Sequence, residues 1–81
     1  MTPQHEELME VLANRDFIFV EETDAVVYEK KSNEETQTIT MVKNTGAVLH
    51  ENYNKNGMLT SSTGYDITKI GSTARLLRSI R

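Results

Sequence analysis

Two histidines, His5 and His50, are the only imidazole groups in this chain of 81 residues. Imidazole is the side chain most suited to proton transfer near neutral pH. Nucleophilic catalysis needs a serine, threonine or cysteine held against such a base, but neither histidine lies in a motif typical of a nucleophile or of a zinc site. We expect His5 in the first turn of a helix and His50 on a strand, both exposed to solvent. The sequence therefore predicts no catalytic residue and no enzyme.

Phosphate and metal motifs do not fit the spacing either. Six residues separate Gly57 from Gly64, where a phosphate-binding P-loop has four and a lysine after its second glycine. Residues 69–73 place a lysine, a glycine and two hydroxyl groups at an expected helix start, which ordinary helix capping explains. The acidic pairs lack the glycine of a calcium loop, and without cysteine there is neither a thiolate ligand nor a disulfide. We expect no metal and no cofactor.

Charge is distributed unevenly along the chain, whose net charge is −3. Residues 1–35 carry ten acidic and three basic side chains, whereas residues 67–81 carry four basic side chains and no acidic one. An acidic surface favours a basic protein partner, and a basic helix favours phosphate groups. We expect the two ends to neutralise each other within one fold. The acidic candidates for protein binding are Glu21, Glu22, Asp24, Glu34 and Glu35, and the basic candidates for nucleic-acid binding are Lys69, Arg75, Arg78 and Arg81.

The positioning elements are two helices and a set of short strands. Thr2 and Pro3 are typical of a helix start, and apolar residues at helical spacing predict a helix over residues 3–14. A second, amphipathic helix is expected from Ser72 onward, with Asp66 as an alternative earlier start. Runs of β-prone residues separated by turn residues predict four strands, at 17–22, 25–30, 36–42 and 47–53. Residues 54–57 predict a turn, and residues 58–60 after it are expected either to begin a short fifth strand or to belong to an irregular stretch.

These elements predict an α+β fold in a single domain of residues 1–81. We expect a four-stranded, or five-stranded, antiparallel meander with both helices covering one face of the sheet. The other face is then wet, and Thr36, Thr38 and Thr40 form a row on it. The core candidates are Ile39, Met41, Val26, Tyr28, Phe17, Phe19, Leu49, Leu8, Leu12 and Leu77.

Residues 17–20, Phe-Ile-Phe-Val, are apolar on both faces of their strand. Such a strand is expected to be covered on both sides, either centrally by helices or by a second subunit. This run is therefore the sequence feature that favours a homodimer.

A binding function is the one that the sequence favours. The first hypothesis is a non-catalytic module that acts by protein–protein contact, through the acidic surface or an exposed strand edge. In size and charge the chain resembles the small accessory and inhibitor proteins of bacteria and their phages. The alternative is a nucleic-acid-binding regulator that uses the basic C-terminal helix. The element order is similar to that of double-stranded-RNA-binding domains, but residues 71–75 carry one basic side chain where that family has several lysines.

Location follows from composition. The first residues are acidic and contain no basic segment of the kind that begins a signal peptide, and no apolar run is long enough to cross a membrane. Together with the absence of cysteine, this predicts a cytoplasmic protein that does not contact a membrane.

Overall fold

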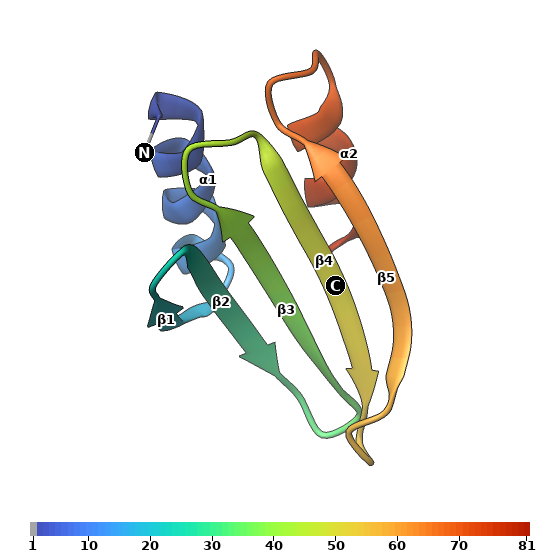
Figure 1. Cartoon of the computed structure of the whole chain (residues 1–81). Helices are drawn as coiled ribbons and strands as arrows, with labels where there is room; N and C mark the ends of the chain where they lie inside the picture. Colours follow the sequence, from blue (N-terminus) through green and yellow to red (C-terminus); the bar gives the residue numbers. More distant parts are fainter. Residues whose placement is uncertain (1) are drawn as a thin grey trace.

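The computed structural model describes residues 2–81, which form two helices and five strands (Figure 1). The order along the chain is α1 (Pro3–Asn14), β1 (Ile18–Glu22), β2 (Ala25–Lys31), β3 (Glu35–Val42), β4 (Ala47–Asn54), β5 (Leu59–Asp66) and α2 (Ser72–Ser79).

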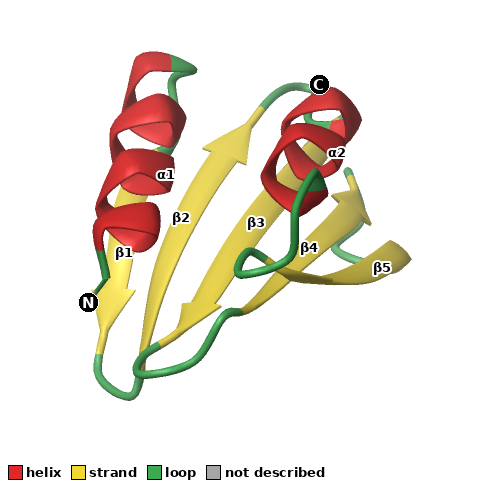
Figure 2. Cartoon of the chain, turned by 90° about the horizontal axis from the view of Figure 1, so that it is seen from above, coloured by secondary structure: helices red, strands yellow, loops and turns green. Residues whose placement is uncertain are grey.

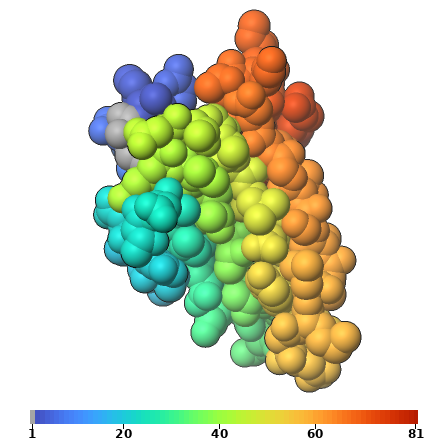
Figure 3. Space-filling model, in the orientation of Figure 1, coloured from blue at the N-terminus to red at the C-terminus, as the bar shows by residue number. Residues whose placement is uncertain are grey.

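All five strands belong to one antiparallel sheet in which neighbours along the chain are neighbours in space, in the order β1-β2-β3-β4-β5. Both helices lie on the same face of this sheet, α1 towards the β1 side and α2 towards the β5 side (Figure 2). The space-filling view shows the opposite, open face, where the five strands form the surface (Figure 3). The predicted α+β meander is confirmed, with five strands.

The helix boundaries follow from local chemistry. Thr2 caps α1 with its side chain and Pro3 occupies the first turn, where a missing N–H breaks no bond, so the predicted start and the range 3–14 are confirmed. The later of the two expected starts for α2 is also confirmed. Its N-cap is Gly71, whose φ of 83° suits glycine, while Ser72 is the first helical residue and is buried.

Residues 59–66 form a full strand, although the sequence left them between a short strand and an irregular stretch. The turn after β4 is closed by Asn54, whose side-chain oxygen accepts from the N–H groups of Asn56 and Met58. Gly57 adopts a φ of 81° in this turn. The returning chain then pairs with β4 along its length. Threonine favours strands, but the serines and the glycine between the threonines do not, so the ladder to β4 decides the conformation.

The register of β3 is the predicted one. Ile39 and Met41 are buried beneath the helices, and the threonine row faces the open side. In the neighbouring strand β4, the side chains that face the helices are the opposite set from the expected one. Val48 lies opposite Met41 and His50 opposite Ile39, so these two side chains face the helices, and Leu49 faces the open side. The assignment of Leu49 to the core was wrong.

The buried core lies between the sheet and the helices. Among the other predicted core residues, Leu8, Leu12, Phe17 and Val26 are buried, whereas Phe19 is exposed and was assigned wrongly. Tyr28 and Leu77 pack partly buried against the cluster. Three buried apolar residues were not among the predicted core: Val48, Ile67 and Leu76.

In the turn between β3 and β4, Asn44 adopts the left-handed conformation, with a φ of 65°, and Gly46 does not. Gly46 is instead required by space, because a Cβ atom at this position would collide with the side chains of Asp66 and Thr68. The backbone N–H of Ile67 donates to the Gly46 carbonyl and holds the end of β5 against this turn.

Candidate functional site

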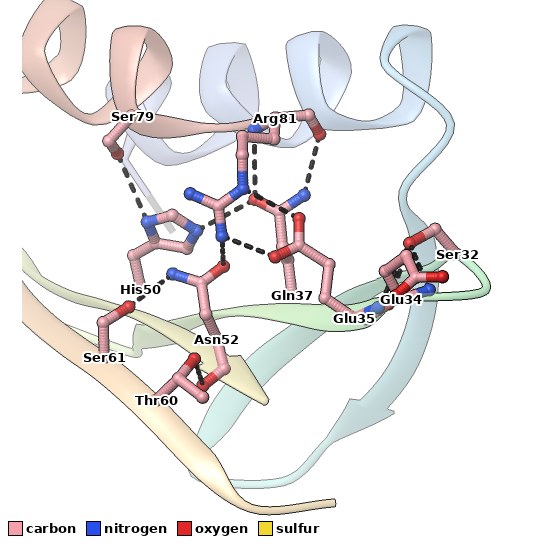
Figure 4. Close-up of polar contacts among 10 residues, drawn as sticks. All are labelled: Ser32, Glu34, Glu35, Gln37, His50, Asn52, Thr60, Ser61, Ser79 and Arg81. Atoms are coloured by element: carbon pink, nitrogen blue, oxygen red, sulfur yellow. Dashed lines mark hydrogen bonds and ion pairs between the residues drawn. The ribbon is translucent and has the colours of Figure 1, made fainter. Parts of the chain in front are cut away.

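Polar side chains gather on the helix-covered face of the sheet, beneath the last residues of the chain (Figure 4). The central members, Gln37, His50 and Asn52, are buried although they lie on strands. They come from the middle of the sheet, where Gln37 of β3 lies opposite Asn52 of β4. We call this group the polar cluster, and its members are Glu35, Gln37, His50, Asn52, Ser61, Ser79 and Arg81.

Gln37 fastens the end of the chain to the sheet. Its side-chain Nε2 donates to the Arg81 carbonyl at 2.7 Å, and its Oε1 accepts from the Arg81 backbone N–H at 3.1 Å. The Gln37 side-chain amide therefore forms with the Arg81 backbone the two hydrogen bonds that a neighbouring strand would form. The Arg81 guanidinium binds both carboxylate oxygens of Glu35, at 2.8 and 2.6 Å, and also donates to Asn52 at 3.1 Å. The hydrogen bonds from Arg81 hold the pKa of the Glu35 carboxyl below its ordinary value.

His50 is buried, with 3% of the residue exposed, so the expected exposed position was wrong. Its Nε2 lies 3.2 Å from Gln37 Oε1 and its Nδ1 lies 3.2 Å from Ser79 Oγ. Because the Gln37 amide nitrogen already donates to Arg81, its oxygen faces the ring, and Nε2 must carry the proton. In the neutral ring Nδ1 is then an acceptor for the Ser79 hydroxyl. Burial lowers the pKa of His50, with a further contribution from the nearby Arg81 charge, which favours this neutral form.

The contact between Ser79 and His50 has the geometry of a hydroxyl next to a base, and Gln37 orients the ring on its other side. Ser79 Oγ also donates to the Leu76 carbonyl at 2.7 Å and accepts from the Tyr65 hydroxyl at 3.2 Å. Its proton is therefore shared with a backbone acceptor of its own helix. These contacts of Ser79 hold α2 against β4 and β5.

A pH dependence of stability follows from His50. Its folded pKa lies below the ordinary 6.5, so between these two values the unfolded chain binds more protons than the folded chain. We therefore expect the unfolding free energy to be constant above about pH 7 and to fall as the pH drops below 6.5. A second loss begins below 4.5, because Arg81 lowers the folded pKa of Glu35.

Urea unfolding over this pH range measures the first loss, and ring-proton NMR assigns it. The His50 ring signal should titrate below 6.5. His50→Gln, which keeps a polar side chain without a titrating proton, should flatten the stability curve near pH 6. A His50 ring that titrates at or above its ordinary value would contradict the arrangement described here.

His5 is also buried, with 1% of the residue exposed, and the expected solvated position was wrong. It follows Thr2 by three residues and closes a capping box, in which the Thr2 hydroxyl lies 2.6 Å from the ring Nδ1. Its Nε2 is buried without a hydrogen-bond partner among the described residues. His5 lies on the same face of α1 as Leu8 and Leu12, and it packs with them towards the sheet.

The acidic candidates lie at two ends of β2 and do not form one surface. Glu21, Glu22 and Asp24 surround the hairpin between β1 and β2 and are exposed. Glu22 pairs with Lys43 at 3.0 Å. At the opposite end, Glu34 is exposed in the turn between β2 and β3, and Glu35 is held by Arg81 in the polar cluster.

The basic candidates also divide. Lys69, Arg75 and Arg78 are exposed on α2 and the loop before it, whereas Arg81 is engaged with Glu35 and Asn52. No ion pair between α1 and α2 occurs among residues 2–81, so the acidic and basic helices are not joined by direct charge contacts. The expected neutralisation is seen at Glu35 with Arg81, where the two ends of the charge pattern meet.

β1 is an edge strand, and its outer side has no partner strand in the part of the chain that the structure describes. The expected central position beneath helices was wrong, because 69% of Ile18, 48% of Phe19 and 52% of Val20 is exposed. Cover by a second subunit, the other expectation, stays a prediction. Phe19 contacts Tyr28 edge to face at 5.9 Å. The register with β2 shifts between Phe19 and Glu21, which marks a bulge in the strand. We call residues 18–22 the β1 edge.

A cleft of about 140 Å³ lies between the two helices. Leu8 and Val11 of α1 and Leu77 of α2 supply its apolar walls, and Gln4, Glu7 and Thr73 supply its polar ones. The volume is below that of typical small-molecule pockets, which are about 300 to 1,000 Å³.

Within residues 2–81, no group of histidine, aspartate and glutamate side chains is arranged to hold a metal ion, and neither helix has the length and apolar character to cross a membrane. Comparison of the chain with protein-family models, with curated proteins and with solved structures gave no match.

Proposed function

We propose that this protein is a non-catalytic binding module that acts by protein–protein contact, with the β1 edge as its docking site. One observation carries the proposal: an edge strand that leaves three consecutive apolar residues, Ile18, Phe19 and Val20, exposed beside Glu21 and Glu22. An extended segment can add to such an edge through main-chain hydrogen bonds, and its alternate side chains then contact the exposed ones.

Charge indicates the kind of segment that fits. The β1 edge ends in two glutamates, and Asp24 follows in the hairpin. The helix α1, which carries further acidic residues, lies near β1 on the helix-covered face of the sheet (Figure 2). A partner with apolar and basic residues in alternation would pair its apolar side chains with the exposed strand and its cations with these carboxylates. The proposed partner is a cytoplasmic protein. The proposed role is that of an accessory or inhibitor protein, as small acidic proteins of bacteria and phages have.

The competing function is nucleic-acid binding by α2. Lys69, Arg75 and Arg78 are exposed, and residues 67–81 contain no acidic side chain to oppose them. Because Arg81 is bound to Glu35, this surface has three available cations instead of the four expected. A few phosphate contacts give binding that weakens steeply with salt.

Capture from a lysate of the source cells, with and without nuclease and at about 0.05 and 0.2 M salt, separates the two functions. We expect a defined protein to stay bound after nuclease treatment, and we expect Arg75→Ala with Arg78→Ala to leave its recovery unchanged. Both side chains are exposed on α2, so the double variant should fold normally. Loss of capture with nuclease, or with this double variant, would overturn the proposal and assign the function to α2.

A further inference from the structure

The second edge of the sheet, β5, differs from β1 in chemistry. Its residues Leu59–Gly64 are all exposed, and it runs along one margin of the molecule with no helix or strand of residues 2–81 beyond it (Figures 1 and 3). Residues 59–65 read Leu-Thr-Ser-Ser-Thr-Gly-Tyr and contain no charged side chain and no proline. Charged residues, prolines and bulges are the usual means by which an edge strand is protected from pairing with another chain. Residues 59–65 have neither of the first two, and their one register shift lies at the start of the strand, between Leu59 and Ser61.

The hydrogen bonds of the strand show which backbone groups are free at this edge. The N–H of Ile67 donates inward, to Gly46 at the start of β4. In an antiparallel ladder, the groups of successive residues point alternately towards and away from the partner strand. Tyr65, Thr63 and Ser61 therefore face β4, and the N–H and C=O groups of Ser62 and Gly64 face outward.

We propose that two copies of this chain pair through β5, antiparallel, to form a continuous ten-stranded sheet. With the two-fold axis at Thr63, Ser62 of one copy lies opposite Gly64 of the other, so outward-facing groups meet outward-facing groups. The one carboxylate of the strand, Asp66, then lies opposite Thr60 of the other copy. The two Asp66 residues are six positions apart along the strand, or about 20 Å, which exceeds the Debye length of about 8 Å.

Charge distinguishes the two edge strands. The uncharged β5 suits a second copy of this chain, and the acidic β1 suits a different partner. Pairing of two β1 edges about Val20 would set Glu21 and Glu22 of each copy against Phe19 and Ile18 of the other, which places carboxylates against apolar side chains. β5 is uncharged over seven residues and complementary to itself about a two-fold axis. This dimer does not depend on the function proposed for β1. It leaves the β1 strand of each copy exposed at an outer edge of the joint sheet.

Sedimentation equilibrium over micromolar to millimolar concentrations tests the pairing. We expect the mass to rise from 9.2 kDa to twice this value. Ser62→Pro removes one outward N–H and leaves the ladder to β4 intact, since proline is tolerated at an edge where the N–H faces solvent. This variant should remain a monomer. Ser62→Ala, which keeps the N–H, should dimerise like the natural chain.

Amide hydrogen exchange makes the result independent of how well the proline variant folds. In the natural chain, the Ser62 and Gly64 amides should gain protection as concentration rises, while the Phe19 amide does not. The proposal is overturned by a chain that stays at 9.2 kDa throughout, or by a dimer in which Ser62 and Gly64 exchange as fast as in the monomer.

Discussion

Replacing Gln37 by alanine should lower the free energy of unfolding by about 2 to 3 kcal/mol, because it leaves several buried polar groups without partners. The side chain pairs with both backbone groups of Arg81 and accepts from His50 Nε2. Its removal also frees the end of the chain that carries the ion pair to Glu35. For a domain of this size such a loss corresponds to a drop of roughly 10 to 20 °C in the midpoint of thermal unfolding.

Thr38→Ala is the matched control for this experiment. Thr38 is the next residue on the same strand and points to the open face. Its hydroxyl oxygen is buried and has no hydrogen-bond partner among residues 2–81, so its removal leaves no other polar group unpaired. We expect this variant to unfold within about 0.5 kcal/mol of the natural chain. Equal losses from both substitutions would mean that the polar cluster is not what fastens the chain end.

Exchanging Ile18 and Val20 for lysine should reduce capture of the partner protein by tenfold or more. Both side chains are more than half exposed, so the pair of substitutions leaves the core residues Phe17 and Val26 untouched. Lysine at these positions removes the apolar contacts and repels a basic segment, and both effects oppose the proposed partner. Ile18 lies opposite Glu29, which can accept the new cation, so we expect the fold to persist.

Met58→Lys with Ile70→Lys provides the same change in charge and the same loss of exposed apolar surface at other places. Met58 lies in the turn before β5 and Ile70 in the loop before α2, and both are highly exposed. Capture should survive this control. If both double variants lose the partner equally, net charge and not the β1 edge governs binding.

The sequence was sufficient for the elements with strong local signals. Thr2 and Pro3 determined the start of α1, and the alternation of threonines with Ile39 and Met41 determined the faces of β3. In β4 apolar residues occur at both parities, Val48 on one face and Leu49 on the other, so the strand pattern alone cannot assign the buried face. A shift by one residue reverses every side chain, and this shift placed His50 in solvent and Leu49 in the core.

The polar cluster was beyond prediction for a related reason. Gln37 and Asn52 are of types that are mostly exposed, and their burial depends on pairing between β3, β4 and the residue at position 81. β5 was missed as a full strand because Ser61, Ser62 and Gly64 interrupt its strand-favouring residues, and the ladder to β4 is what extends the strand through them. In residues 17–20 the apolar pattern was real, but a strand that is apolar on both faces is equally compatible with a buried centre and an exposed edge.

The most direct test of the central claim, that the β1 edge binds an apolar and basic strand, is an NMR titration with a short synthetic peptide that alternates valine and lysine. A peptide that alternates valine and glutamate serves as the control. We expect saturable amide shifts at Ile18–Glu22 with the lysine peptide and none with the glutamate peptide. If neither peptide shifts these amides, or if the shifts occur at α2 instead, the assignment of the docking site to β1 is wrong.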